Sequence, residues 1–518
     1  MPISATIHQV LKRSVNILFS FFEDYFYEKP VNLVILSIGI ILSINIYFSL
    51  CQVMKGGFIE TDMWFFAYRI DEIADKGLRS LFNTPYGFTD VHPPLYYLVT
   101  VPLRKIGLSV LSIAALLRII IPITVIYLVY RTACMLFGKQ AAAMACLFVA
   151  LMPPSGSYHG LWTSTPSAVS LVPFLSGVYL LVKFSESHEM KWLSSSVILL
   201  LLASLTHVLT AFTSLIFLGC SLWFFREKIP KYFILILIVI FVIISAYGWF
   251  FFSSIARSTS LLDVLQNAFG DPSPQKASSL RQFFFIAYWP RHLTLIASVS
   301  FCGALFHFYN KKVPLRAIDN VFFASVIILA VYSQLFLVGI YLANQRFLLY
   351  LLFPIGMYGG YGFTKEVMPV LKRNTFLKFS FFASILLFSV YQTGITLAYY
   401  PTTIRDKEVR SLNELNEVLP DGTVYVQNWF HNGRYLFAYT TGRTDIVWDV
   451  ALNRQIGSVK DDILSVIVSS EVEYLVVASE TMMNSYMSAL NDNISLLWTD
   501  GRFYLLEVHT QINYRNTF

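Results

Sequence analysis

Long apolar runs, separated by short polar segments, fill the chain between residues 31 and 400. A helix needs about 20 apolar residues to cross a bilayer, and most of these runs approach that length. The pattern predicts a polytopic α-helical membrane protein with about eleven spans. The expected spans are residues 31–50, 109–137, 141–152, 168–184, 192–206, 208–225, 232–252, 292–309, 321–341, 345–363 and 376–397.

Lysines and arginines between these runs fall on one side of the membrane almost throughout. Because cytoplasmic loops are enriched in Lys and Arg, this side is the cytoplasm. We therefore expect residues 1–30 to form a cytoplasmic or interfacial leader and residues 31–400 to form the membrane domain. Residues 93–107 are apolar but short, which predicts a partial or surface helix. The expected outer loops are residues 52–92, 153–165 and 253–290.

The pattern changes after residue 400, where polar residues become frequent. Short β-rich runs alternate there with helical patterns, which predicts a small α/β domain at residues 401–518 outside the cytoplasm. We expect strands at 423–427, 474–478 and 502–508, and helices at 460–470 and 480–489.

Composition supports a membrane location, since 56% of the 518 residues are hydrophobic and 13% are charged. Soluble domains carry about 25% charged residues. The net charge of +7 is explained by the loop lysines and arginines, and no basic cluster with interleaved aromatics indicates nucleic-acid binding. The five cysteines show neither a metal-binding spacing nor a disulfide framework. We expect a multi-pass protein of a cell membrane or an ER-type membrane.

The first outer loop carries two acids, Glu60 and Asp62, immediately before a helical pattern. Asp62 is suited to cap a helix beginning at Met63, and Gly77 is suited to end it in a left-handed conformation. Such a helix would be amphipathic and could lie flat on a bilayer surface. Its apolar stripe is Trp64, Phe65, Tyr68 and Ile73, and its polar side is Arg69, Asp71, Glu72 and Lys76.

Sugar transfer from a polyprenyl phosphate needs a base or orienting carboxylate for the acceptor and cations for the leaving phosphate. Asp62 is our candidate base; the alternative is that it only caps the helix. Glu60 is its candidate partner. The sequence requires no cofactor, but oxygen ligands from Glu60 and Asp62 would suit magnesium or manganese. Arg346, at the outer start of a predicted span, is the candidate for the phosphate; otherwise it reaches into the headgroup region.

Further polar residues lie in the expected outer segments. His92 could contact a phosphate or cap a turn, and His159 and His207 could serve the site or the structure. Residues 428–434 could stack on a sugar or bind the acceptor, or form a strand–turn core. The candidates for substrate binding, with Arg346, are Asp90, His92, His159, Trp429, His431 and Arg434.

This arrangement resembles the GT-C superfamily of membrane glycosyltransferases. Glu60-Thr61-Asp62 resembles the acid pair of its first outer loop, and the run from Asp90 to Leu95 resembles the end of that loop in protein O-mannosyltransferases. The layout also resembles the catalytic subunit of oligosaccharyltransferases, which has a late membrane arginine, comparable to Arg346, and a Trp-Trp-Asp-Tyr-Gly motif that residues 428–433 resemble loosely.

The chain departs from the oligosaccharyltransferase pattern at three places. Residues 163–165 are Thr-Ser-Thr where that family has metal-binding acids, the C-terminal motif lacks its Asp, and residues 253–290 lack a Thr/Ser-x-x-Glu motif. We expect an integral-membrane transferase that moves a sugar from a polyprenyl-phosphate donor to a protein, lipid or glycan acceptor at the outer face. Alternatives are oligosaccharide transfer to protein and, in another class, a transporter or flippase.

Overall fold

The computed structural model describes residues 2–55, 57–58, 62–81, 94–151, 163–233, 295–334, 347–384, 406–426, 433–443, 446–448, 472–490 and 493–509, with single residues at 161, 235, 239, 242 and 387. The chain divides into two compact units. Unit 1 contains Met1–Ser49, Thr89–Val99 and Ala114–Tyr399. Unit 2 contains Leu50–Phe88, Thr100–Ile113 and Tyr400–Phe518, so it combines the first outer loop with the C-terminal segment.

The fold is mostly helical, as predicted. Within the described ranges, three helices are long and apolar enough to cross a membrane: α2 (Pro30–Lys55), α5 (Val110–Phe137) and α7 (Pro166–Ser187). Each coincides with a predicted span. Other predicted spans coincide with the shorter helices α6 (Lys139–Ala150), α8 (Met190–Ser204), α9 (Val208–Phe225), α14 (Leu295–Asn310), α15 (Ala317–Gln334) and α16 (Phe347–Gly362). The total of about eleven spans stays a prediction.

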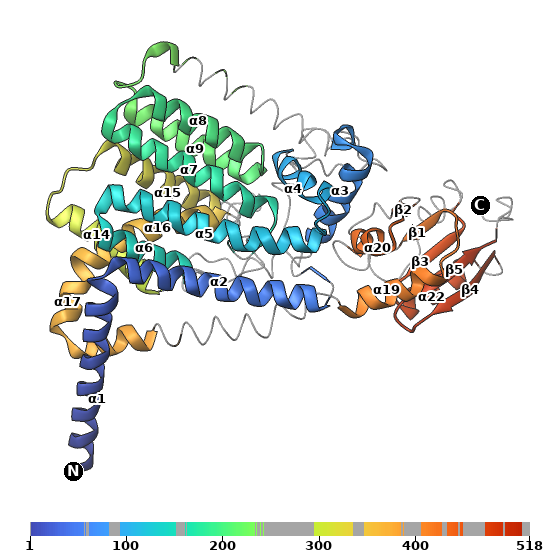
Figure 1. Ribbon diagram of the computed structural model, residues 1–518, viewed down its shortest axis with the longest axis horizontal. Helices are drawn as coiled ribbons and strands as arrows, with labels where there is room; N and C mark the ends of the chain where they lie inside the picture. The colour runs from blue at the N-terminus through green and yellow to red at the C-terminus, as the bar shows by residue number, and fades with distance from the viewer. Residues whose placement is uncertain are drawn as a thin grey trace. The chain divides into compact units, whose positions relative to one another are not determined.

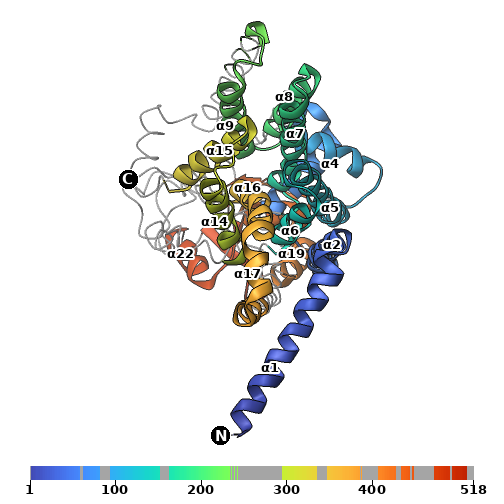
Figure 2. The same cartoon turned by 90° about the vertical axis from the view of Figure 1, so that its left-hand side faces the viewer.

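Unit 1 is held together by close helix packing around α16, which lies between α6 and α14 (Figure 2). Two glycines allow this approach. A Cβ at Gly360 would overlap the Ala141 carbonyl of α6, and one at Gly362 would overlap the Ser300 carbonyl of α14. The backbones therefore touch at positions where any side chain would separate the helices.

The N-terminal leader forms α1 (Pro2–Phe21) and a π-helical turn at Phe22–Tyr27. An ion pair between Lys372 Nζ and Glu23 Oε1 at 2.5 Å joins this N-terminal segment to a helix that follows α16. Lys372 lies in α17 (Met368–Arg373), which follows a second π-helical turn at Phe363–Val367.

The C-terminal part of unit 2 contains a five-stranded mixed sheet of order β2-β1-β3-β5-β4, orange to red in Figure 1. Strand β1 pairs in parallel with β2 and β3, and β5 pairs antiparallel with β3 and β4. The strands are β1 (Val424–Val426), β2 (Ile446–Trp448), β3 (Tyr474–Val477), β4 (Ile494–Thr499) and β5 (Tyr504–Val508).

Three helices accompany this sheet: α19 (Asp406–Val418), α20 (Gly433–Thr441) and α22 (Glu480–Leu490). Tyr486 of α22 joins Leu475 and Leu506 in one apolar core. The predicted strands β1, β3 and β5 and the helix α22 are present. Strands β2 and β4 and helices α19 and α20 were not predicted, and the helix expected at 460–470 lies outside the described residues.

Candidate functional site

The helix after the acid pair is α3 (Asp62–Lys76), which begins one residue before the predicted start. Gly77 ends it with φ +86°, and its N–H donates to the Ile73 carbonyl at 2.9 Å, as the predicted left-handed C-cap requires. A 3₁₀ turn, Leu78–Leu81, follows. The backbone of Asp62 is therefore fixed as the first residue of α3, whereas its side chain and Glu60 lie outside the described residues.

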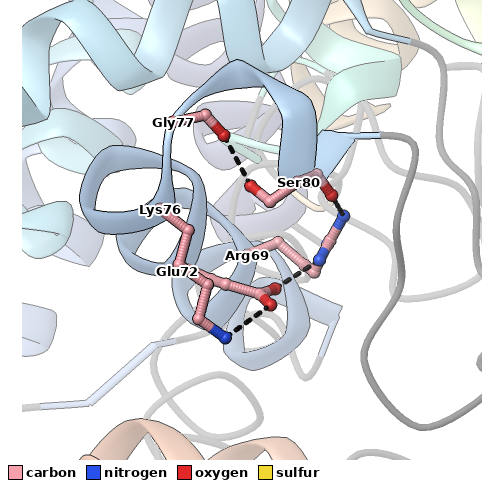
Figure 3. Close-up of polar contacts among 5 residues, drawn as sticks. All are labelled: Arg69, Glu72, Lys76, Gly77 and Ser80. Carbon is pink, nitrogen blue, oxygen red and sulfur yellow. Dashed lines mark hydrogen bonds and ion pairs between the residues drawn. The ribbon is translucent and has the colours of Figure 1, made fainter.

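The expected polar side of α3 is wrong at three positions: Asp71 shares a face with Trp64, and Arg69 and Glu72 are buried. Arg69 and Glu72 are 4% and 6% exposed, so they do not form a solvated face. They pair with each other, and Arg69 Nη2 also donates to the Ser80 carbonyl at 2.9 Å (Figure 3). A buried charge is tolerated when it is paired and hydrogen-bonded, which explains how a helix with these residues packs inside the unit. That α3 lies flat at a bilayer surface stays a prediction.

Aromatic rings hold the first turn of α3 against α20. Trp64 is fully buried, with ring centroids 4.9 Å from Phe58 and 5.7 Å from Tyr439 of α20. Phe58 and Tyr439 also meet edge-to-face at 5.6 Å. Edge-to-face pairs at such distances add specific geometry to the apolar burial. Trp64 is two residues after Asp62, so this cluster fixes the helix turn that carries the candidate base.

An ion pair holds the same helix farther along. Arg104 Nε, in α4 (Leu95–Lys105), donates to Asp71 Oδ1 at 2.5 Å. Burial, supported by the Asp71 carboxylate and opposed by Arg104, raises the pKa of Tyr439 to about 12. Phe58, Trp64, Asp71, Arg104 and Tyr439 thus form one cluster within unit 2, which we call the α3 anchor.

A second polar cluster lies in unit 1, at the start of α7. Its hydrogen bonds join Thr163 to Thr165 at 3.0 Å, Thr165 to Ser167 at 2.9 Å, and Ser170 to Thr210 of α9 at 2.6 Å. Thr210 also bonds the hydroxyl of Tyr350 in α16. We call these six residues the hydroxyl cluster; all are buried.

Several predicted site residues lie close in the sequence to members of the hydroxyl cluster. Tyr350 follows Arg346 by four residues, and His207 Nδ1 lies 3.4 Å from Thr210 Oγ1. The start of α4, just after His92, also reaches this region, because Tyr96 donates to the Ser164 carbonyl at 3.0 Å. The predicted residues themselves, namely Asp90, His92, His159, Arg346, Trp429 and His431, lie outside the described residues, and Arg434 is placed by its backbone in α20 only.

The Thr-Ser-Thr run noted in the sequence, residues 163–165, is buried beside the start of α7. Its hydroxyls are neutral, and in the part of the chain that the structure describes no group of three His, Cys, Asp or Glu side chains could hold a metal ion. The residues predicted to hold a metal, Glu60 and Asp62, have no described side chains.

Sequence reasoning missed the α3 anchor and most of the hydroxyl cluster. Tyr439, Asp71 and Arg104 belong to no motif and come from three distant segments. Thr210 could have been found from the sequence. It follows His207 by three residues, a spacing that places both polar side chains on the same face of a helix. Arg118, fully buried in α5, was also missed, although a cation within a predicted span is a functional hypothesis by default.

No protein-family model matches the chain, and no curated protein matches it by sequence. Solved structures do match. The apo oligosaccharyltransferase of Archaeoglobus fulgidus matches with a TM-score of 0.54 and 15% identity, over 95% of this chain and 76% of that one. The same enzyme, tethered to an acceptor peptide containing the NVT sequon, matches with a TM-score of 0.54 and 12% identity, over 94% and 74%.

ArnT from Cupriavidus metallidurans, bound to undecaprenyl phosphate, matches with a TM-score of 0.59 and 11% identity. That match covers 91% of this chain and 97% of ArnT. At these identities the likeness concerns the fold.

Proposed function

We propose, from the GT-C fold that this chain shares with those membrane glycosyltransferases, that it transfers a sugar from a polyprenyl-phosphate donor to an acceptor at the extracytoplasmic face. The observation that carries the proposal is α3, the helix that begins at Asp62: in a chain of this fold, the contacts of the α3 anchor fix this helix. A catalytic carboxylate needs such a rigid support.

In this proposal Asp62 deprotonates or orients the acceptor, and Glu60 is its partner. Arg346 and His92 stabilise the leaving phosphate, since cations and hydrogen-bond donors oppose the charge that develops there. Asp90 and His159 contribute to substrate binding. A magnesium or manganese ion on Glu60 and Asp62 is the alternative arrangement, which activity measured with and without a chelator would test.

The acceptor is assigned to the segment before α20. Trp429, His431 and Arg434 offer a stacking surface, hydrogen bonds and a cation, and they lead into the helix that packs on α3. The match to ArnT, a structure bound to undecaprenyl phosphate, supports a polyprenyl-phosphate donor. Transfer of a lipid-linked oligosaccharide to protein is the second candidate, favoured by the match to the enzyme that holds an acceptor peptide.

We propose further that the chain lies in a cell membrane or an ER-type membrane, with residues 401–518 as an α/β domain outside the cytoplasm. Loop lysines and arginines on the opposite side support this orientation. The matching structures reported above are transferases, which supports transfer over the transporter or flippase alternative.

The test compares cells with the wild-type gene, with Asp62→Asn and without the gene, by mass spectrometry of glycans and lipid-linked sugars. Loss of a general base lowers the rate by about 10²- to 10⁴-fold, so Asp62→Asn should lose the product and accumulate the donor lipid. Asp75→Asn is the matched control, because it removes an exposed carboxylate from the same helix. Normal product with Asp62→Asn, in a protein present at wild-type level, would remove the base assignment.

A further inference from the structure

We infer that the C-terminal segment positions the catalytic carboxylate: Tyr439 of α20, with the Asp71–Arg104 ion pair, holds α3 in the orientation that presents Asp62 to the acceptor. The inference rests on the proposed function. Tyr439, Asp71 and Arg104 are positioning residues, because they act on Asp62 through the helix and do not touch the reacting atoms.

The first step is that α3 is held at two points on one face. Trp64 and Asp71 are seven residues apart, which is about two turns and roughly 10 Å along an α-helix. Trp64 meets the Tyr439 ring at 5.7 Å, and Asp71 meets Arg104 at 2.5 Å. Two contacts on the same face fix both the direction and the rotation of a helix. They therefore fix its first residue, Asp62.

The second step is that Tyr439 supports both points at which α3 is held, the contact at Trp64 and the ion pair at Asp71. Its ring packs on Trp64 and Phe58, and its phenol lies in the field of Asp71 and Arg104. The ion pair is only partly buried, with the side chains of Arg104 and Asp71 38% and 31% exposed. Removing the ring would loosen the aromatic contact and expose the pair further. Because water weakens an ion pair, both supports of α3 would weaken together.

The third step links the acceptor segment to the carboxylate. Arg434 is in the first turn of α20, and Tyr439 is five residues later in the same short helix. An acceptor bound at Arg434 would therefore contact the same short helix that carries Tyr439. We therefore expect Tyr439 variants to change kcat and the acceptor KM, and to leave the donor KM unchanged.

The experiment compares Tyr439→Leu with Tyr439→Phe in the full-length protein in proteoliposomes, using the donor and acceptor pair identified by mass spectrometry. A misplacement of about 1 Å at a catalytic group costs on the order of 100-fold, so Tyr439→Leu should lower kcat by roughly 10- to 100-fold. Tyr439→Phe keeps the ring and should keep most of the activity. Tyr486→Leu removes another buried tyrosine of unit 2, from the sheet core, and should keep kcat in whatever fraction stays folded.

A charge exchange tests the second point. Asp71→Arg alone should lower kcat, and combining it with Arg104→Asp should recover most of the loss. Hydrogen exchange of the α3 amides gives a readout independent of turnover: it should rise in Tyr439→Leu and return to the wild-type level in Tyr439→Phe.

The inference is overturned if Tyr439→Leu keeps the wild-type kcat and exchange, or if Tyr486→Leu lowers kcat per folded molecule equally. It is also overturned if the charge exchange recovers nothing. Its failure is distinguishable from that of the proposed function. If wild type transfers sugar and Asp62→Asn does not, the function stands whatever Tyr439 does; if Asp62→Asn turns over normally, the premise of the inference is lost with the base.

Discussion

At Tyr439, burial and a neighbouring carboxylate act on one phenol. The ordinary pKa of 10.0 rises to about 12, chiefly because burial disfavours the phenolate. The folded chain therefore holds this proton more tightly than the unfolded chain does. The side chain stays a neutral, packing ring throughout the physiological range, as a positioning role requires.

The shift predicts how stability depends on pH. A group whose pKa is raised on folding contributes stability that is complete below pH 10.0 and falls as the pH rises toward about 12. We expect the difference in melting temperature between wild type and Tyr439→Phe to be constant below this window and to shift against wild type within it. Thermal unfolding in detergent across this pH range checks the prediction; a constant difference up to pH 12 would contradict it.

Trp64 is a second residue of the α3 anchor whose polar group takes no part in the described contacts. In the described part of the chain its indole N–H has no hydrogen-bond acceptor. A buried donor without an acceptor costs free energy, so Trp64 is held for its ring and not for its N–H.

At the scale of elements, α3 is a helix that buries two of its charged residues. Arg69 and Glu72 are buried as a pair, and Lys76 Nζ reaches Glu72 at 3.3 Å. Removing one partner leaves an uncompensated buried charge, whereas replacing both with apolar residues removes the desolvation cost as well.

We therefore expect Arg69→Met to lower the free energy of unfolding by about 3 kcal/mol and to lower the yield of folded protein. Adding Glu72→Leu should restore at least half of the loss. Thermal unfolding of the wild type, the single variant and the double variant measures this. A double variant no more stable than Arg69→Met would mean that the pair contributes through something other than mutual charge compensation.

Regular patterns explain which elements were predictable. Helix α3 follows a 3.6-residue apolar repeat that a C-cap glycine ends, and β1, β3 and β5 are dense β-branched or aromatic runs. Helix α20 was not predicted, because its sequence, GRYLFAYTT, is rich in Tyr, Phe and Thr, which favour strands. Its contact with α3 overrides that local preference.

The site was predictable only where chemistry is visible in one short segment. Glu60 and Asp62 are two acids separated by one residue before a helix, so they were found as candidates, and their catalytic role stays a prediction. Tyr439 could not be found in this way, because its contact with Trp64 joins segments hundreds of residues apart. Arg104 and Ser80 lie nearer in the sequence to their partners Asp71 and Arg69, but in segments whose packing together no local pattern predicts.

At the scale of the whole molecule, the proposed orientation places the C-terminal domain and the cytoplasmic loops on opposite sides of the membrane. Asp421 is exposed in the turn before β1, and Glu227 is exposed in the loop after α9. The positive-inside pattern assigns the first to the outside and the second to the cytoplasm.

Cysteines introduced at these two positions, in a variant whose five native cysteines are replaced, test the orientation. A membrane-impermeant maleimide added to intact cells should label Asp421→Cys and should label Glu227→Cys only after permeabilisation. The reverse pattern would overturn the orientation and place the proposed chemistry on the cytoplasmic face.

The contact between Trp64 and Tyr439 also has a consequence for how the protein is made. At roughly 5 to 20 residues per second, a ribosome needs about 20 to 75 s to synthesise the about 375 residues that separate these two rings. During that interval the segment that carries Trp64 has been synthesised, but the Tyr439 ring that packs against Trp64 has not. The segment that would carry the chemistry is therefore among the first to leave the ribosome and among the last to reach its final packing.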